Sequence, residues 1–444
     1  MTLNHLTPNN KLSLTNNKEL ITNMHQKFLL DNQIRLIVNE LPHTRSVTMS
    51  IYVGTGARYE AERVSGISHF VEHMLFKGTA KRPTAHDIAV AIEGIGGFFN
   101  ASTGQELTNY YVKVAYQHFD VGLDVLSDML RESLFDPNEI EKERRVIIQE
   151  IRETFDTPDE LVFFDLDALM WLPHPLGRDV AGSVESVSGI SRADMLNYLA
   201  QHYRPDNLVI SVAGYVKAQD IIPQINAKLA GLPHAPHATF ARFEPAQERA
   251  RWQVRYKKTE QAHIAVSTWA YHRNHPDRYS VGVLNSILGD GMSSRLFQEI
   301  REKQGLAYSV SSFGSSLDDC GYFGSYAAVD PKTAPVTLEA MLYEWGRLAN
   351  ELVPEQELTK AKELIKGSIL LSMEDTHSIA AWYGRQEAYR QEILTVDEVT
   401  AAIDQVTAED VQRVARDIFR NDWLNLAVVG PFKSDAKFVR ALRV

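Results

Sequence analysis

The chain carries the trace of an internal duplication, which constrains its architecture more than any other feature. Segments of the first half recur in the second at an offset of about 216 residues, and a fixed offset across separated segments is what duplication of a folded unit leaves behind. The matched pairs are Val47–Val53 with His263–Trp269, Asp136–Glu139 with Val353–Glu357, and Leu208–Gly214 with Leu424–Gly430. We therefore expect two homologous domains in tandem.

The length and composition of the chain agree with this expectation. A chain of 444 residues is too long for one ordinary core, and its hydrophobic fraction of 44% is typical of a globular protein. No run of about eighteen apolar residues predicts a membrane span, and the net charge of -11 argues against nucleic acid as the main partner. The single cysteine, Cys320, excludes an internal disulfide framework and fits a reducing compartment.

Changes in composition along the chain suggest its division. The start is polar and has neither an apolar signal region nor an arginine, so we expect a flexible lead-in and a cytoplasmic location. The expected parts are a lead-in at 1–24, a first domain at 25–230, a Pro- and His-rich linker at 231–250, and a second domain at 251–444. His234 and His237 in the linker are separated by proline and have no acidic or cysteine neighbour, so we do not expect a metal site there.

The periodicity of apolar residues predicts short strands and longer helices, and hence an α+β fold. Each domain is expected to be a mainly antiparallel sheet packed against helices. Thr84 is suited to cap a helix that stops at Gly94. In the first half we expect a hairpin turning at Asp31-Asn32, helices at 85–93, 118–133, 137–154, 161–170 and 192–203, and a second hairpin at 98–114.

A metal-binding pattern lies in the segment Gly66–Thr79, where His69, Glu72 and His73 form H-x-x-E-H among apolar residues. On a helix, residues four apart share one face, so the two imidazoles can reach a single metal ion with Glu72 beside them. The alternative is a helix that carries two surface or core histidines. Neutral imidazole is the commonest metal ligand, which favours the metal site.

A third ligand is expected because catalytic zinc sites usually have three protein ligands. The strongly helical segment Asn138–Glu153 carries Glu143 and Glu150, which are two turns apart and therefore share one face. The alternative for these glutamates is an exposed helix face with salt bridges, and we prefer it for the others in the segment, Glu139, Glu141 and Glu153.

The H-x-x-E-H motif, followed at this distance by a helix with two glutamates, resembles the inverzincin metallopeptidases related to pitrilysin, insulin-degrading enzyme and the mitochondrial processing peptidase. The resemblance implies that His69, His73 and Glu150 bind one zinc ion per chain. It also implies that Glu72 is the general base and that Glu143 supports a ligand. In the family, two such domains make half of a clamshell.

Two further elements carry the resemblance. Asn100, Ala101, Ser102 and Thr103 match a family N-A-x-T segment, which implies an edge strand that binds the substrate peptide as an added strand. An ordinary buried hairpin explains the same residues.

In the second half, Ser293–Gly305 stands where we expect the counterpart of the metal helix, and it carries no pair of metal ligands. It leads into R-x-x-x-G-L-x-Y, which implies that Arg301 and Tyr308 bind the substrate backbone and the oxyanion. The alternative is a helix ending at Gly305 with Tyr308 packed in a strand.

The resemblance implies hydrolysis of peptide bonds in peptides or unfolded, presequence-like polypeptides, with zinc-activated water and Glu72 as base. Because the chain has two domains where large family members have four, we expect a homodimer, or a heterodimer with a related subunit. Two rival functions stay open: a non-catalytic or partner-requiring subunit of a two-subunit processing peptidase, and a metal hydrolase acting on another bond.

Overall fold

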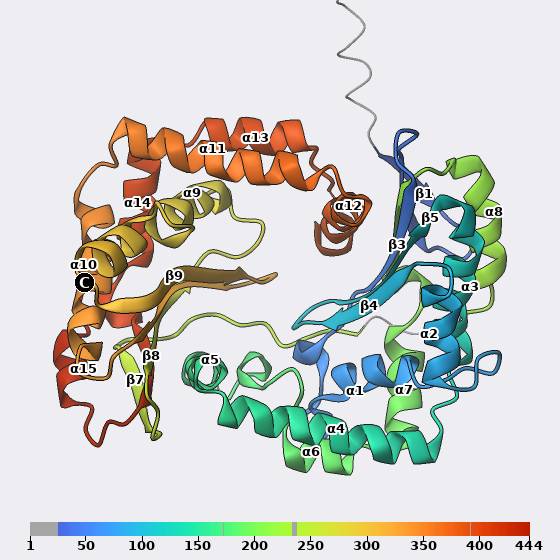
Figure 1. Cartoon of the computed structure of the whole chain (residues 1–444), viewed down its shortest axis with the longest axis horizontal. Helices are drawn as coiled ribbons and strands as arrows, with labels where there is room; N and C mark the ends of the chain where they lie inside the picture. The colour runs from blue at the N-terminus through green and yellow to red at the C-terminus, as the bar shows by residue number, and fades with distance from the viewer. Residues whose placement is uncertain (1–24, 172, 233–237, 391) are drawn as a thin grey trace, which may run out of the picture.

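The computed structural model describes residues 25–171, 173–232, 238–390 and 392–444. The expected lead-in and the two linker histidines, His234 and His237, lie outside these ranges. Two β-sheets with helices around them stand on opposite sides of the molecule, so the predicted α+β fold is confirmed (Figure 1). Among the described residues, no helix combines the length and apolarity needed to cross a membrane.

The first sheet has six strands in the order β1-β2-β6-β3-β5-β4. Only β2 and β6 run parallel, and the other neighbours are antiparallel. The strands are β1 Gln26–Leu29, β2 Arg35–Glu40, β3 Ser46–Val53, β4 Phe98–Thr103, β5 Thr108–Ala115 and β6 Leu208–Gly214. Both expected hairpins are therefore present, and β4 forms one edge of the sheet.

The second sheet repeats this plan with five strands in the order β7-β11-β8-β10-β9. Here too the pair β7 and β11 is parallel and the other pairs are antiparallel. The strands are β7 Arg251–Tyr256, β8 Ala262–Ala270, β9 Ala307–Ser316, β10 Gly321–Val329 and β11 Asn425–Gly430. Strand order and direction agree between the halves, as expected for a duplicated unit, and the parallel pairs β2/β6 and β7/β11 share one register at an offset of 216 residues. Only β1 has no counterpart among the described residues.

The helices follow the same duplicated plan. Those of the first half are α1 Ile67–Leu75, α2 Ala85–Glu93, α3 Phe119–Glu132, α4 Pro137–Asp156, α5 Pro158–Trp171, α6 Val184–Gly189, α7 Arg192–His202 and α8 Ala218–Leu229. Those of the second half are α9 Arg278–Gly289, α10 Ala334–Asn350, α11 Glu355–Ser372, α12 Thr376–Arg390, α13 Val396–Asp404, α14 Ala408–Ile418 and α15 Ala436–Ala441. Short 3₁₀ turns occur at Ala57–Tyr59, Glu62–Val64, Tyr116–His118, Pro175–Gly177, Pro205–Asn207 and Asn421–Trp423, and a π-helical segment at Phe297–Lys303.

Local sequence explains the helix ends that were predicted. Thr84 forms a reciprocal capping box with Asp87 at the start of α2, which ends before Gly94 as expected. The side chain of Asp136 caps α4, and Pro137 occupies its first position, where a missing N–H costs nothing.

The two halves exchange one helix each, a feature that the sequence did not reveal. Helix α5 of the first half packs on β7, β8 and β11, while α12 of the second half packs on β2, β3 and β6. Figure 1 shows α4 leading along one side into α5, and α11 leading along the opposite side into α12. The buried residues that join α5 to the second sheet are Leu161, Val162, Leu166, Met170, Trp171, Ala265, Trp269, Ala427 and Val429. Those that join α12 to the first are Ile379, Ala380, Tyr383, Ile37, Tyr52, Val209 and Ala213.

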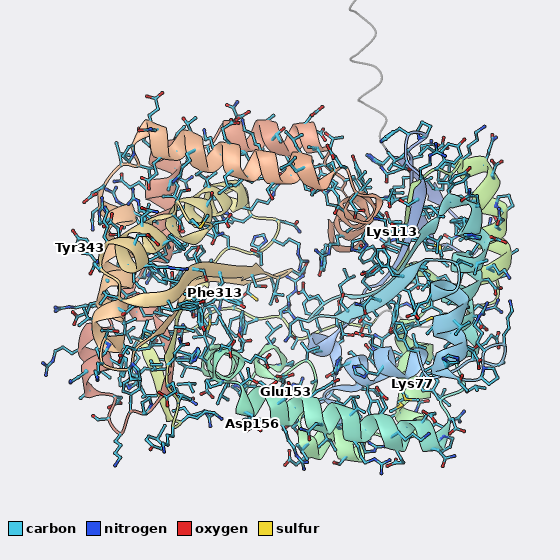
Figure 2. The ribbon with its side chains drawn as sticks, in the orientation of Figure 1. Lys77, Lys113, Glu153, Asp156, Phe313 and Tyr343 are labelled. Carbon is cyan, nitrogen blue, oxygen red and sulfur yellow. The ribbon has the colours of Figure 1, made fainter. Side chains whose placement is uncertain are left out.

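Further contacts, polar and aromatic, also join each exchanged helix or its start to the sheet of the other half. Arg35 on β2 donates to the carbonyl oxygen of Glu387 in α12 at 3.2 Å, and Arg251 on β7 donates to that of Leu169 in α5 at 3.2 Å. Figure 2 labels one partner in each of two further contacts between the halves: Lys113 of β5, which pairs with Asp375 just before α12, and Phe313 of β9, which faces Phe163 of α5 at 5.0 Å between ring centroids.

A buried cluster of charged side chains lies between the two halves and joins them. Arg58 donates to Glu106 at 2.7 Å, to Asp319 of the second half at 2.5 Å, and to the carbonyl oxygen of Ala241 at 2.9 Å. Arg273 of the second half also donates to Glu106. Because breaking one partner of such a pair leaves a charge buried and unpaired, the cluster fixes the relative position of the halves.

We expect Leu166→Ala to destabilise the whole chain rather than one half. Leu166 belongs to the first half but is 1% exposed beneath the second sheet, and Leu→Ala at such a site costs about 3 kcal/mol. In calorimetry, a single unfolding transition should move to lower temperature. Leu371→Ala, at a leucine that is 74% exposed, is the matched control with little effect. Two separable transitions, of which only one moves, would contradict the interlocked arrangement.

Candidate metal centre

Helix α1 is fixed in place by its buried apolar side chains and by a close backbone contact at its start. Its apolar side chains are buried, which leaves His69, Glu72 and His73 only partly covered on the opposite face. Gly66 precedes the helix with φ +92, and a Cβ at this position would meet the carbonyl oxygen of Ala181 at 2.4 Å. Only glycine fits such a close approach in the left-handed region.

A buried carboxyl group supports the first turn of α1. Glu60 accepts the backbone N–H groups of Gly66 at 2.7 Å and Ser68 at 2.8 Å, and the Ser68 hydroxyl contacts the hydroxyl of Tyr198 at 2.8 Å. Burial raises the pKa of Glu60 to about 7, although these hydrogen bonds favour the charged form. Sequence reasoning missed Glu60, because no spacing rule links it to the H-x-x-E-H helix.

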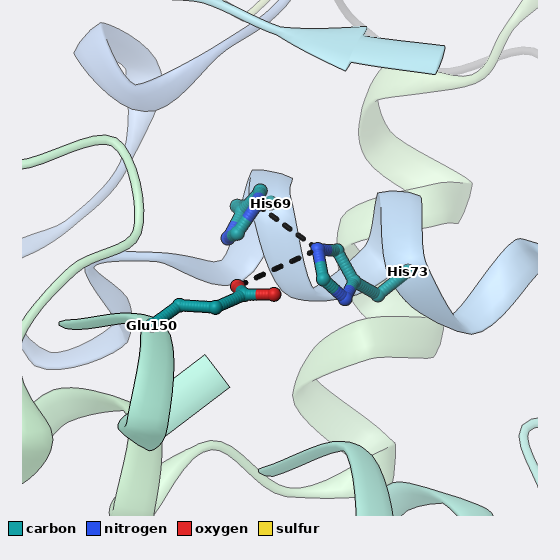
Figure 3. A group of neighbouring side chains, drawn as sticks. All are labelled: His69, His73 and Glu150. Atoms are coloured by element: carbon teal, nitrogen blue, oxygen red, sulfur yellow. Dashed lines mark hydrogen bonds and ion pairs between the residues drawn. The ribbon is translucent and has the colours of Figure 1, made fainter. Parts of the chain in front are cut away.

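The structure brings His69, His73 and Glu150 together, as Figure 3 shows. The Nε2 atoms of the two histidines are 3.0 Å apart, and His73 Nε2 lies 3.9 Å from Glu150 Oε2. One ligand atom from each residue lies within 4.8 Å of the other two. Since the ligand atoms of a tetrahedral zinc site lie roughly 3.3 Å apart, these three donors fit one zinc ion with little movement.

Glu143 forms a hydrogen bond with the Nδ1 edge of the His73 ring. Its carboxylate lies 2.8 Å from His73 Nδ1 and 2.7 Å from the ammonium of Lys77, so the other ring nitrogen is directed toward His69. Burial disfavours protonation of His73, but the hydrogen bond to Glu143 and the charges of nearby carboxylates outweigh it and raise the pKa. Burial likewise opposes ionisation of Glu143, yet His73 and Lys77 keep the pKa of this carboxyl below its ordinary value.

Lys77 was missed by sequence reasoning, although its distance of four residues from His73 was a usable signal.

His69 differs electrostatically from His73. Burial, helped by the charge of His73, lowers the pKa of His69 to about 4. Its imidazole is therefore neutral at physiological pH, the form in which histidine binds a metal. The donor set of two imidazoles and one carboxylate thus fits zinc chemically as well as geometrically.

Glu72 lies between these residues and the edge strand β4. The hydroxyl of Thr103 at the end of β4 donates to its carboxylate. Burial raises the pKa of Glu72, opposed by that hydrogen bond and by the charge of His73. In the described part of the chain β4 pairs only with β5, so Asn100, Ala101, Ser102 and Thr103 lie on an open edge.

Arg301 and Tyr308 lie together in the second half of the chain, whereas the three candidate ligands belong to α1 and α4 of the first half. The guanidinium of Arg301 is 5.5 Å from the centroid of the Tyr308 ring. The alternative is correct in placing Tyr308 in a strand after a helical segment that ends just before Gly305, but the side chain is 73% exposed on the edge strand β9 rather than packed.

The counterpart of α1 in the second half differs from the expected segment. In chain order, α1 and α2 between β3 and β4 correspond to α9 and the π-helical segment between β8 and β9. Thus α9, rather than Ser293–Gly305, stands in the place of α1. Its sequence contains no histidine, cysteine, aspartate or glutamate.

Two family models match the chain. The model described as Insulinase (Peptidase family M16) matches residues 35–184, which include the candidate ligands. The model described as Peptidase M16 inactive domain matches residues 189–365, which include Arg301 and Tyr308.

Proteins with similar sequences are named zinc proteases. The uncharacterized zinc protease YmxG of Bacillus subtilis is 35% identical over 92% of this chain and 98% of its own length. An uncharacterized zinc protease of Streptomyces coelicolor is 37% identical over 91% of this chain and 89% of its own length. The crystal structure of a protease from Helicobacter pylori covers 92% of this chain and 99% of its own, with a TM-score of 0.88 and 22% identity, and so shares the fold. This chain therefore belongs to peptidase family M16.

Proposed function

We propose that this chain is a zinc-dependent endopeptidase that hydrolyses peptides or unfolded polypeptides, with Glu72 as its general base. The observation that supports this most strongly is the position of Glu72. It lies beside the three candidate metal ligands on one side and is bonded to the open edge strand β4 on the other. A base between a metal centre and a peptide-binding edge suits hydrolysis of an extended chain.

Each residue of the candidate metal centre has a distinct role in the proposed hydrolysis. A zinc ion held by His69, His73 and Glu150 supplies Lewis-acid activation of water and of the scissile carbonyl. Glu72 accepts the proton of the water and returns it to the leaving amine, and its raised pKa makes it a stronger base than an ordinary glutamate. Glu143 keeps His73 in the orientation that directs Nε2 at the metal.

The edge strand β4 accounts for the class of substrate. An extended peptide can add to its free side through backbone hydrogen bonds, which need no particular side-chain sequence. A folded protein cannot offer such a strand without local unfolding. We therefore infer a preference for flexible polypeptides, and presequence-like peptides remain within that class.

We further propose a homodimer, because Arg301 and Tyr308 form an exposed pair on the half that lacks metal ligands. In a dimer, this pair of one protomer can donate to the substrate carbonyl held at the zinc of the other. A heterodimer with a related subunit would use the same surfaces. The rival function, a non-catalytic subunit, is disfavoured because all three candidate ligands and the base are present together.

Digestion of a mixed library of unstructured peptides tests the proposed activity. We expect the zinc-loaded protein to cleave internal peptide bonds, and Glu72→Gln to lose at least about a thousandfold in kcat while it still binds zinc. Mass spectrometry identifies the products, and metal analysis serves as the control for zinc. If zinc is bound and no peptide is cut, the catalytic proposal fails and a partner-requiring subunit becomes the better account.

Zinc binding should depend on pH through His73. Zinc needs the neutral imidazole, so each ion must displace the proton that the raised pKa favours on His73. The apparent affinity should fall about tenfold per pH unit below that pKa. His69, with a pKa of about 4, adds no proton above about pH 5.

Calorimetry in two buffers of different ionisation enthalpy measures the released proton. At pH 6 we expect about one proton per zinc ion for the wild type and fewer for Glu143→Gln, because that variant removes an anion that raises the His73 pKa. Equal proton release by the two proteins at this pH would contradict the assigned role of Glu143.

Thr103 should affect the rate more than substrate binding. Thr103→Val removes the hydroxyl that orients Glu72 but keeps the shape and backbone of β4, so we expect kcat to fall about tenfold with little change in KM. Thr103→Ser keeps the hydroxyl and should restore most of the rate. An effect confined to KM, or equal loss in both variants, would show that Thr103 acts only through β4.

A further inference from the structure

The two sheets differ at one edge. In the first sheet β1 covers the outer side of β2, whereas β7, the counterpart of β2, has no further strand beside it among the described residues. Register with β6 and β11 makes Trp252 the equivalent of Leu36, and Val254 the equivalent of Val38. In the first half, β1 runs antiparallel to β2, and its Phe28 lies opposite Leu36.

The backbone of β7 offers hydrogen bonds on its free side. The amide of Arg251 donates to the chain of β11 at 2.9 Å, and so does that of Lys257. Alternate residues of a strand direct their backbone groups to opposite edges, so the N–H and C=O groups of Trp252, Val254 and Tyr256 face the open side. These are the groups that an added strand would pair with.

A hollow of about 560 Å³ lies over the same three side chains. Its lining is Trp252, Val254, Tyr256, Phe432, Lys433, Ser434 and Asp435. Trp252 is 41% exposed and Tyr256 is 57% exposed, which is unusual for aromatic side chains in a sheet.

In the first half, other elements lie at the equivalent place. The turn after β1 is tied to α8, since the side-chain amide of Asn32 donates to the carbonyl oxygen of Leu229 at 2.8 Å. Helix α15, which follows β11 as α8 follows β6, has 6 residues against 12 in α8. The second half therefore leaves open an aromatic surface that the first half covers with an antiparallel strand.

Charge indicates what can fill this surface. Lys433 in the lining and Lys258 just beyond β7 are exposed, and within the described ranges neither has an ion-pair partner. Asp435 is engaged by the indole N–H of Trp252 at 2.9 Å. A second copy of β7 pairing antiparallel about its centre would place Arg251 opposite Lys257, and like charges in that position are destabilising. Both free ammonium groups lie where β7 ends, so they favour an acidic segment at that end.

We propose that β7 binds an extended peptide segment of another protein as an added antiparallel strand, with acidic residues preceding alternating apolar ones. Antiparallel pairing brings the acidic amino end to Lys258 and Lys433, while the apolar residues pack on Trp252 and Tyr256. The site is separate from the metal centre and does not depend on the proposed peptidase activity.

Fluorescence anisotropy with a labelled Glu-Glu-Val-Thr-Phe-Thr-Val peptide tests this site. The Glu72→Gln protein serves as the host, so that the probe is not cut, and binding at β7 is taken as the part that Val254→Pro weakens, because β4 can also bind an extended peptide. We expect saturable binding in the micromolar range, and at least about tenfold weaker binding of Lys-Lys-Val-Thr-Phe-Thr-Val and of the acidic peptide written in reverse order.

Two variants on this host separate the backbone and charge contributions. Val254→Pro removes an outward N–H without disturbing the bonds to β11, and should weaken the acidic peptide about tenfold. Lys433→Glu should reverse the preference between the acidic and basic peptides, whereas Lys332→Glu, at an exposed lysine outside the hollow, should not.

Three results would overturn the proposal. They are equal binding of both peptides, binding unaffected by Val254→Pro and Lys433→Glu, and self-association of the wild type that Lys433→Glu abolishes. The last would identify the occupant of β7 as a second copy of this chain.

Discussion

Helix α5 belongs to the first half of the chain but packs against the sheet of the second half, and this packing positions α4. Helix α4 carries Glu143 and Glu150 and leads directly into α5, whose apolar side chains are buried under β7, β8 and β11. The far end of α4 is therefore anchored in the other half of the chain. The second half thus helps to place Glu150 opposite His69 and His73.

Electrostatics at the centre then follow from where each group lies. Burial and a cationic neighbour keep His69 neutral, whereas Glu143 and the other carboxylates favour a proton on His73 until a metal replaces it. Glu60 lies beneath α1 as a buried acceptor for its first amides, and Thr103 ties Glu72 to β4. Two histidines of one helix therefore have opposite pKa shifts because of their different neighbours.

Much of this could be predicted from the sequence, because the relevant signals are local. Thr84 and Gly94 mark the ends of α2, and the spacings of four and seven residues place His69 with His73, and Glu143 with Glu150, on single helix faces. That the two helices meet at one metal site was implied by the resemblance to the inverzincin metallopeptidases and not by local spacing. The exchange of α5 and α12 could not be predicted, since an apolar helix face does not say which sheet will cover it. Helices α6 and α8 were also missed, and the sequence left open whether Tyr308 is exposed or packed.

X-ray absorption at the zinc edge of the purified protein tests whether His69, His73 and Glu150 together bind zinc. We expect coordination by nitrogen and oxygen at about 2.0–2.1 Å, with the outer-shell scattering of two imidazoles. His73→Ala should lose half of that scattering or the metal itself. A shell containing sulfur at about 2.3 Å, or one without imidazole, would contradict the account.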